Sequence, residues 1–229
     1  MKRALEEQFV PQQRFRSAAL TLIVVNVIIY VVQLILGDRF TNAFLLNSSE
    51  VWARPWILIT SMFLHADPTH LIFNMYALLV FGPLIEQKIG TRRFVFIYFL
   101  SGILASVIST FFYERALGAS GAIMGILGVT IMLLPHLQVL FFFFIPMSLR
   151  TAGIIFAAID IFGIFVPSGI ANIAHIVGLG TGLLYGWHLL RKKREFTKRF
   201  VEKSPKKKKA DALMLSNEDI EDYLKHGRL

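Results

Sequence analysis

The stretch GASGAIMGILGVTIMLL, residues 118–134, decides the fold because it is apolar throughout and yet carries one serine, Ser120, between two glycines. A helix that starts at Ser120 and ends before Pro135 is about 22 Å long, at about 1.5 Å per residue. A bilayer core is about 30 Å thick, so this helix does not reach across it. Its irregular lead-in must then be buried in protein or line a wet cavity. The sequence therefore predicts Ser120 at the floor of a water-filled dip.

Composition points to the membrane class. The 229 residues are 55% hydrophobic, and their mean hydropathy is +0.60, far above that of a soluble domain. The net charge of +9 is concentrated at the chain ends and in short breaks between apolar runs. This distribution favours basic flanks of membrane segments over nucleic-acid binding. The chain has no cysteine, which excludes disulfides, cysteine nucleophiles and thiolate metal sites.

Apolar runs long enough for helices recur along the chain. A spanning helix needs about 20 mostly apolar residues, and the first run is long enough to be a retained span rather than a signal peptide. The fold class expected is all-α, a polytopic membrane bundle of six transmembrane helices. The predicted helices cover 17–36, 69–86, 94–112, 120–134, 149–166 and 171–190.

The remaining parts of the chain complete the predicted domain organisation. Residues 1–16 form a cytoplasmic N-terminal segment, 17–191 the membrane core, and 192–229 a basic cytoplasmic tail. Within the core, the long loop 37–68 carries Trp52 and Trp56, and we expect it to lie at the membrane interface with these rings as anchors. The tail contains Lys206–Lys209, a cluster attracted to anionic lipid, and a short polar helix is expected over 211–226.

Basic residues set the orientation in the membrane. Both termini are predicted to be cytoplasmic, because one side of the predicted bundle receives nearly all of the lysines and arginines, and an even number of spans satisfies this. The residues on that side are Lys2, Arg3, Arg14, Arg16, Lys88, Arg92, Arg93, Arg150 and the tail from Arg191.

Four polar side chains fall at similar depth in this topology. The second, fourth and sixth helices run from outside to inside, so their N-terminal ends share one leaflet. His70 and Asn74 lie near the start of the second, Ser120 starts the fourth, and His175 lies near the start of the sixth. Polar residues within membrane spans are costly and mark functional sites. Each has a plainer interpretation alone: a helix cap for Ser120, an interhelical hydrogen bond for Asn74, a packed interior ring for His175.

Small residues accompany these groups. Gly121, Gly125 and Gly128 share a face of the fourth helix, and Gly178 and Gly182 share the face of His175 on the sixth. Glycine lets two helix backbones approach closely enough for a serine and a histidine to meet. The pattern predicts a Ser120–His175 dyad.

The chemistry expected of this dyad is acyl transfer. His175 acts as general base and then as general acid, while His70, Asn74 and the backbone N–H of Ser120 face the developing oxyanion. Asp160 lies mid-way along the fifth segment, deeper than the site, and a role in orienting His175 is left open. No cofactor and no metal is expected.

These motifs resemble the rhomboid family of intramembrane serine proteases. Gly118-Ala119-Ser120-Gly121 is similar to its GxSG motif, HADPTHLIFN (65–74) to its second-helix signature, and AHIVGLGTG (174–182) to its sixth-helix motif. The resemblance runs from about Trp52 to Gly186. It implies a six-helix core, membrane lipids as surroundings and single-span transmembrane proteins as substrates, cut near the outer membrane face.

The resemblance also implies site roles: Ser120 as nucleophile, His175 as base, and His70 and Asn74 at the oxyanion hole. Two positions depart from the family pattern. An Ile follows Trp56 where many members have Arg, with Arg54 nearby instead, and Met124 stands where many have an aromatic that stacks on the histidine. Neither departure removes a chemical group.

Two other functions compete with the protease hypothesis. A catalytically inactive rhomboid-like protein would bind membrane clients without cutting them, and such relatives typically lack the serine or histidine. A small transporter or channel would use Asp160 and the histidines as an ion path. A metalloprotease is disfavoured because the chain has no HExxH pattern.

Overall fold

The computed structural model describes residues 17–141, 144–166 and 169–203. The predicted N-terminal segment 1–16, the lysine cluster Lys206–Lys209 and the helix expected over 211–226 all lie outside the described residues.

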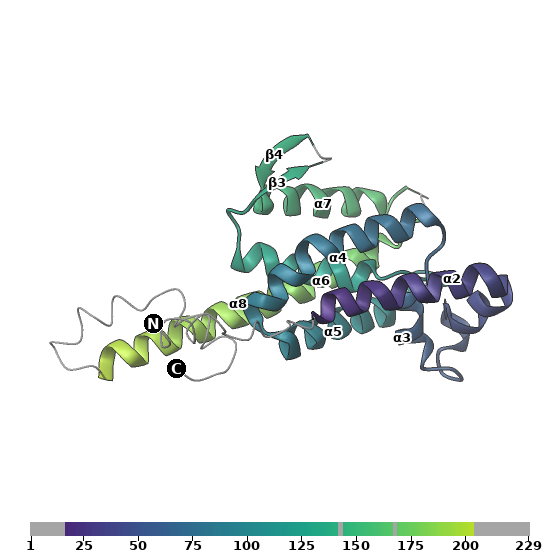
Figure 1. Ribbon diagram of the computed structural model, residues 1–229, viewed down its shortest axis with the longest axis horizontal. Coiled ribbons are helices and arrows are strands. Elements are labelled where there is room, and N and C mark those ends of the chain that lie inside the picture. Colours follow the sequence, from purple (N-terminus) through teal and green to yellow (C-terminus); the bar gives the residue numbers. More distant parts are fainter. Residues whose placement is uncertain (1–16, 142–143, 167–168, 204–229) are drawn as a thin grey trace, which may run out of the picture.

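The described chain forms a mostly helical bundle around a central short helix (Figure 1). This helix, α6 (Ser120–Leu133), packs against α4, α5, α7 and α8. All six segments predicted as helices contain one, with shifted ends. The long helices are α2 (Ala18–Phe44), α4 (Pro68–Ile89), α5 (Thr91–Ser109), α6, α7 (Leu149–Gly163) and α8 (Asn172–Lys203).

The first helix is broken in one place. Gly37 has φ +65° and ψ −156°, which are not helical, so α2 consists of two legs. Only glycine adopts such a conformation without strain. The prediction of 17–36 matches the first leg, but the second leg, up to Phe44, was assigned to the loop and is a correction. Short turns follow: η1 (Ser48–Glu50), α3 (Ile57–Thr60) and η2 (Ser61–Phe63).

A buried carboxylate fastens α4 to the start of α2. Glu86, fully buried in the last turn of α4, accepts hydrogen bonds from the Ser17 hydroxyl at 2.7 Å and from the backbone N–H groups of Ala18 at 2.8 Å and Ala19 at 3.0 Å. A fourth comes from the Thr91 hydroxyl at 2.8 Å. The carboxylate thus satisfies free N–H groups at the positive end of α2. These hydrogen bonds to Glu86 hold the start of α2 against α4.

The glycine faces of α6 and α8 are in backbone contact, as predicted. A Cβ on Gly178 would lie 2.0 Å from the carbonyl oxygen of Gly121, and one on Gly182 would lie 2.0 Å from that of Gly125. A Cβ on Gly128 would lie 2.5 Å from the Leu179 carbonyl. No larger residue fits at these positions without separating the two helices, so the glycines set how closely α6 and α8 approach.

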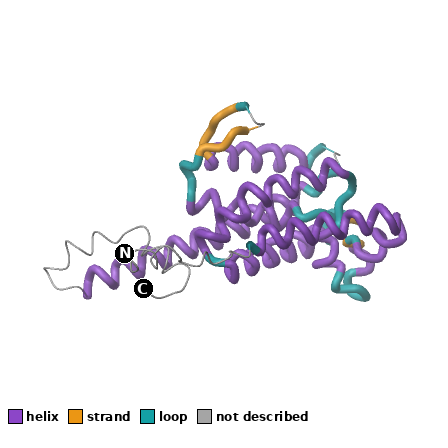
Figure 2. Tube along the Cα trace, in the orientation of Figure 1, coloured by secondary structure: helices purple, strands orange, loops and turns teal. Residues whose placement is uncertain are grey.

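Two short antiparallel sheets are added to the otherwise helical bundle. β1 (Leu46–Asn47) pairs antiparallel with β2 (Arg115–Ala116), and β3 (Gln138–Phe141) pairs antiparallel with β4 (Ile145–Ser148) (Figure 2). The helix α8 also continues to Lys203, beyond the predicted end at 190.

Four of the helices are long and apolar enough to cross a membrane: α2, α4, α5 and, within α8, Asn172–Thr197. The helix α6 is apolar but has only 14 residues, about 21 Å, as the sequence predicts. Trp52 in the loop after η1 is 95% exposed, which suits an interfacial anchor. The chain is a multi-pass helical membrane protein.

Candidate active site

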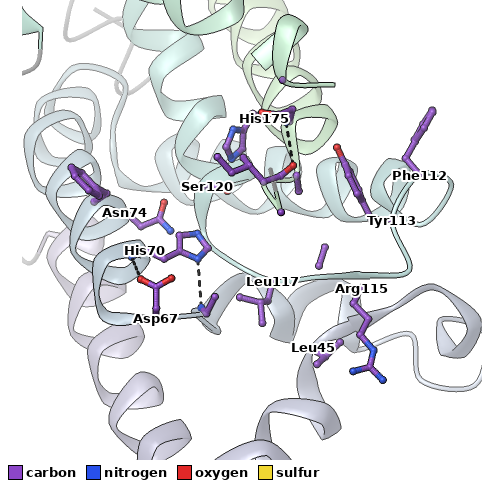
Figure 3. A pocket seen from close by; sticks show the side chains of 18 of the residues that line it. Leu45, Asp67, His70, Asn74, Phe112, Tyr113, Arg115, Leu117, Ser120 and His175 are labelled. Carbon is purple, nitrogen blue, oxygen red and sulfur yellow. Dashed lines mark hydrogen bonds between the residues drawn. The ribbon is translucent and has the colours of Figure 1, made fainter. Parts of the chain in front are cut away.

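One cavity of about 1060 Å³ is lined by the four residues that the sequence singles out (Figure 3). His70 and Asn74 come from the first turns of α4, Ser120 from the first residue of α6, and His175 from the first turn of α8. The structure therefore brings together side chains that are up to 105 positions apart in sequence. The N-terminal ends of three helices form this wall of the cavity.

The start of α4 orients His70. Asp67 caps the helix by accepting the backbone N–H of His70 at 2.8 Å, and Pro68 occupies the first turn. The ring Nδ1 of His70 lies 3.5 Å from the backbone N–H of Ala66, at the limit of a hydrogen bond. If Nδ1 accepts this bond, Nε2 carries the proton of the neutral ring and is a donor for the cavity.

Gly118 lets the lead-in of α6 pass against the His70 ring. Its φ is +125°, and an added Cβ would lie 2.8 Å from Cε1 and 2.9 Å from Nε2 of His70. The backbone N–H of Gly118 donates to the Ser61 carbonyl at 2.9 Å, which ties the lead-in to the loop before α4. Both the conformation and the lack of space require glycine here, and this places Ser120 beside His70.

Asn74 carries a buried donor without a partner. The residue is 7% exposed, and among the described residues its amide Nδ2 finds no acceptor. An unpaired buried N–H group costs about 1–3 kcal/mol. Asn74 also lines the cavity, so a bound acceptor there would remove this cost. The side chain is poised to donate to a ligand oxygen.

His175 has a partner that the sequence left open. Its ring Nδ1 lies 2.9 Å from Oδ1 of Asp160. We expected Asp160 to sit deeper than the site, and that expectation is wrong. The helix α7 ends at Gly163 rather than near 166, so Asp160 falls in its last turn and reaches the first turn of α8.

Ser120 and His175 line the same cavity, but no hydrogen bond joins the hydroxyl to the ring of these two described residues. Hydrogen bonds between a nucleophile and its base are often long in unliganded sites and tighten when substrate binds. The close contact of α6 and α8 holds the two side chains at the same level of the bundle (Figure 3). The geometry thus brings Ser120 and His175 near each other without a hydrogen bond between them.

Sequence reasoning missed two residues that hold the cavity walls. The Tyr113 hydroxyl accepts the backbone N–H of Ile173 at 3.1 Å and so links the lead-in of α6 to the start of α8. Asn172 packs under the end of α7, where a Cβ on Gly163 would lie 2.7 Å from its amide. A tyrosine in a connector and a polar residue at a helix start are common, so no sequence signal distinguished them.

The loop before α4 is anchored from two sides. Arg54 donates to the Ala43 carbonyl at 3.1 Å and pairs with Glu50, so it fastens the loop to the second leg of α2. Gln33 of α2 holds His65 by its backbone, accepting its N–H at 3.0 Å and donating to its carbonyl at 3.3 Å. The His65 ring then packs edge-on to His70, with centroids 5.1 Å apart.

His65 is itself buried, with 1% of its surface exposed, and neither ring nitrogen has a partner among the described residues. Burial, and next the positive charge of His70 when protonated, lower the pKa of His65 from 6.5 to about 4. The ring is therefore neutral at physiological pH and serves as packing beside the cavity.

Fold and site together define the class: a helical membrane protein with a serine, two histidines and an asparagine around one cavity. Comparison of sequences then gives the family. The profile of the Rhomboid domain matches residues 50–192, well over half of the chain, and the chain belongs to the rhomboid family.

Several proteins named as rhomboids are similar to this chain. RHOMBOID-like protein 6, mitochondrial, of Arabidopsis thaliana is 34% identical over 137 residues, which are 59% of this chain and 44% of that protein. Putative rhomboid protease YdcA of Bacillus subtilis is 34% identical over 142 residues, 60% of this chain and 69% of that protein. Rhomboid protease GluP of the same bacterium is 37% identical over 138 residues, 58% of this chain and 26% of that protein. The match thus covers less than half of two of these three relatives.

Proposed function

We propose that this protein is an intramembrane serine protease that cuts transmembrane-helix substrates near the outer membrane face. In this proposal Ser120 is the nucleophile and His175 is the general base and acid. His70 and Asn74 donate hydrogen bonds to the oxyanion. The observation that carries the proposal is the meeting of these four side chains, from three helices, in one cavity of a rhomboid-family protein.

The proposed reaction follows from the groups present. The Ser120 hydroxyl attacks the peptide carbonyl while His175 Nε2 takes its proton. The tetrahedral oxyanion accepts hydrogen bonds from Asn74 Nδ2, His70 Nε2 and the backbone N–H of Ser120, at the positive end of α6. His175 then passes the proton to the leaving amine nitrogen, and an acyl enzyme remains. A water molecule then attacks the acyl enzyme while His175 takes its proton and returns it to Ser120 Oγ. The carboxylic acid product is released.

The arrangement of charge supports the orientation. With the short helices α6 and α7 counted as crossings, six helices cross. The cluster Lys88, Arg92 and Arg93, in the last turn of α4 and the first turn of α5, then faces the same side as the C-terminal end of α8. By the positive-inside rule this side is the cytoplasm, and both termini lie there. The cavity then opens toward the outer face of the cell membrane. A single-span substrate, unwound near its outer end, meets Ser120 there.

Cleavage of a generic single-span substrate in liposomes tests the proposal. The wild-type protein should cut the substrate once, near its outer end, and Ser120→Ala should not cut it. A client-binding protein would retain the substrate uncut with either chain, and a transporter would give ion flux that survives Ser120→Ala. Either result would overturn the protease assignment.

A further inference from the structure

Asp160 occupies a position that is unfavourable for a carboxylate. It lies in the last turn of α7, where the helix dipole is negative, and it is 6% exposed. A buried ionised side chain in a membrane protein is costly unless it is paired. Among the described residues its side chain has one hydrogen-bonding partner, the ring of His175 at 2.9 Å. The favourable contact that offsets this cost is therefore the histidine.

The atoms that meet determine what the contact does. A carboxylate only accepts, so the bond at Nδ1 requires the proton of the neutral His175 ring to be on Nδ1. The lone pair is then on Nε2, the nitrogen that must accept the Ser120 proton. When His175 becomes an imidazolium, the same carboxylate stabilises its charge without taking the proton. The contact thus selects the tautomer of His175 and fixes the direction of its ring.

We propose that Asp160 is the positioning residue of a Ser120–His175–Asp160 triad, in place of a simple dyad. This inference rests on the proposed protease function. During the attack the proton moves from Ser120 Oγ to His175 Nε2 and later to the leaving amine, while Asp160 remains ionised throughout. Asp160 does not touch the substrate and acts on the reaction only through His175.

Isosteric replacement separates this role from a structural one. In Asp160→Asn the amide N–H can donate to Nδ1, which moves the ring proton to Nε2, where it blocks proton acceptance from Ser120. We expect kcat to fall by about 10²–10⁴ with KM within about twofold. Asp160→Ala leaves the ring free to adopt either tautomer, so its kcat should fall less than that of Asp160→Asn. The matched control is Asp38→Asn, an exposed carboxylate of α2, which should keep wild-type kcat and KM.

A structural role predicts the opposite order, because asparagine fills the same volume and alanine leaves a gap. Near-wild-type kcat in Asp160→Asn, or a smaller loss in Asp160→Asn than in Asp160→Ala, would overturn the triad while leaving the protease function intact. Cleavage that persists in Ser120→Ala would instead overturn the protease function and, with it, the triad.

A readout independent of turnover completes the test. Nitrogen NMR of the full chain with ¹⁵N-labelled histidine, with His175 assigned by loss of its signal in His175→Ala, reports which nitrogen carries the proton. At a pH where the ring is neutral, the wild type should show the proton on Nδ1, and Asp160→Asn should show it on Nε2. The same tautomer in both proteins would contradict the inference even if Asp160→Asn lost activity.

Discussion

At the scale of one residue, the buried side chain of Asn74 is the clearest sign of a binding function. Its amide N–H, which has no partner among the residues that the structure describes, is costly in the free protein and indicates a function when a ligand is bound. The spacing of His70 and Asn74, four residues apart on one helix face, was readable from the sequence. The lack of a partner for Nδ2 was not, because it depends on what α6 and α8 bring nearby.

Replacement of Asn74 by alanine tests the proposed oxyanion hole. We expect Asn74→Ala to lower kcat by about 10²–10³, because one donor to the developing charge is lost, with little change in KM or in helix content. Substrate cleavage in liposomes and circular dichroism measure these quantities. A kcat equal to that of the wild type would remove Asn74 from the mechanism.

The buried ring of His65 predicts how stability depends on pH. Burial lowers the pKa of His65 to about 4 in the folded chain, whereas in the unfolded chain the pKa has its ordinary value of 6.5. Between pH 4 and pH 6.5 the unfolded chain therefore binds a proton that the folded chain does not. The free energy of unfolding should therefore fall as pH drops from 6.5 to 4, by about 3 kcal/mol in total. His65→Phe keeps the ring volume and should flatten this slope by about one proton. An equally steep slope in His65→Phe, measured by unfolding in detergent, would show that other groups cause it.

At the scale of elements, the contact between α6 and α8 decides whether Ser120 and His175 can meet. Their glycines bring the two backbones together, and a shift of about 1 Å between reacting groups costs about 10²-fold in rate. Periodicity predicted these faces correctly, because glycines at helical spacing on two apolar segments have few other uses.

Two glycines of α8 offer a matched pair of variants. In Gly182→Ala the new Cβ would meet the Gly125 carbonyl at 2.0 Å, so the helices must separate, and we expect kcat/KM to fall about 10²-fold or more, together with a lower Tm. In Gly180→Ala the Cβ meets nothing within 4 Å, so activity and Tm should remain at wild-type levels. Equal effects of the two substitutions would show that close approach of α6 and α8 is not what the site needs.

Other features of the structure could not be predicted from the sequence, for physical reasons. The strands β1 and β2 have two residues each and pair across 68 to 70 positions, so neither carries a local signal. The partnership of Asp160 with His175 depends on where α7 ends, and an apolar run does not mark its last hydrogen bond. The hydrogen bonds of Glu86 to the start of α2 also join residues remote in sequence. Local patterns located the helices and the candidate residues, but tertiary contacts decided which groups touch.

At the scale of the whole molecule, the cluster of basic residues and the cavity lie at opposite ends of the bundle. Basic residues gather at the end where α4 meets α5 and where α8 continues beyond the predicted span, whereas the cavity lies at the end where α4, α6 and α8 begin. Figure 1 shows that α4 and α8 run across the length of the bundle, which keeps these two regions apart. This polarity is what a protease acting at the outer face would need.

The most direct measurement of the central claim is covalent labelling of the full chain in detergent with a fluorophosphonate. Such a probe forms a bond from serine Oγ to phosphorus, expels fluoride, and requires an activated hydroxyl. We predict a single adduct, mapped by mass spectrometry to the peptide that contains Ser120, in the wild type, and none in Ser120→Ala or His175→Ala. An unlabelled wild type, or labelling that persists in His175→Ala, would contradict activation of Ser120 by His175.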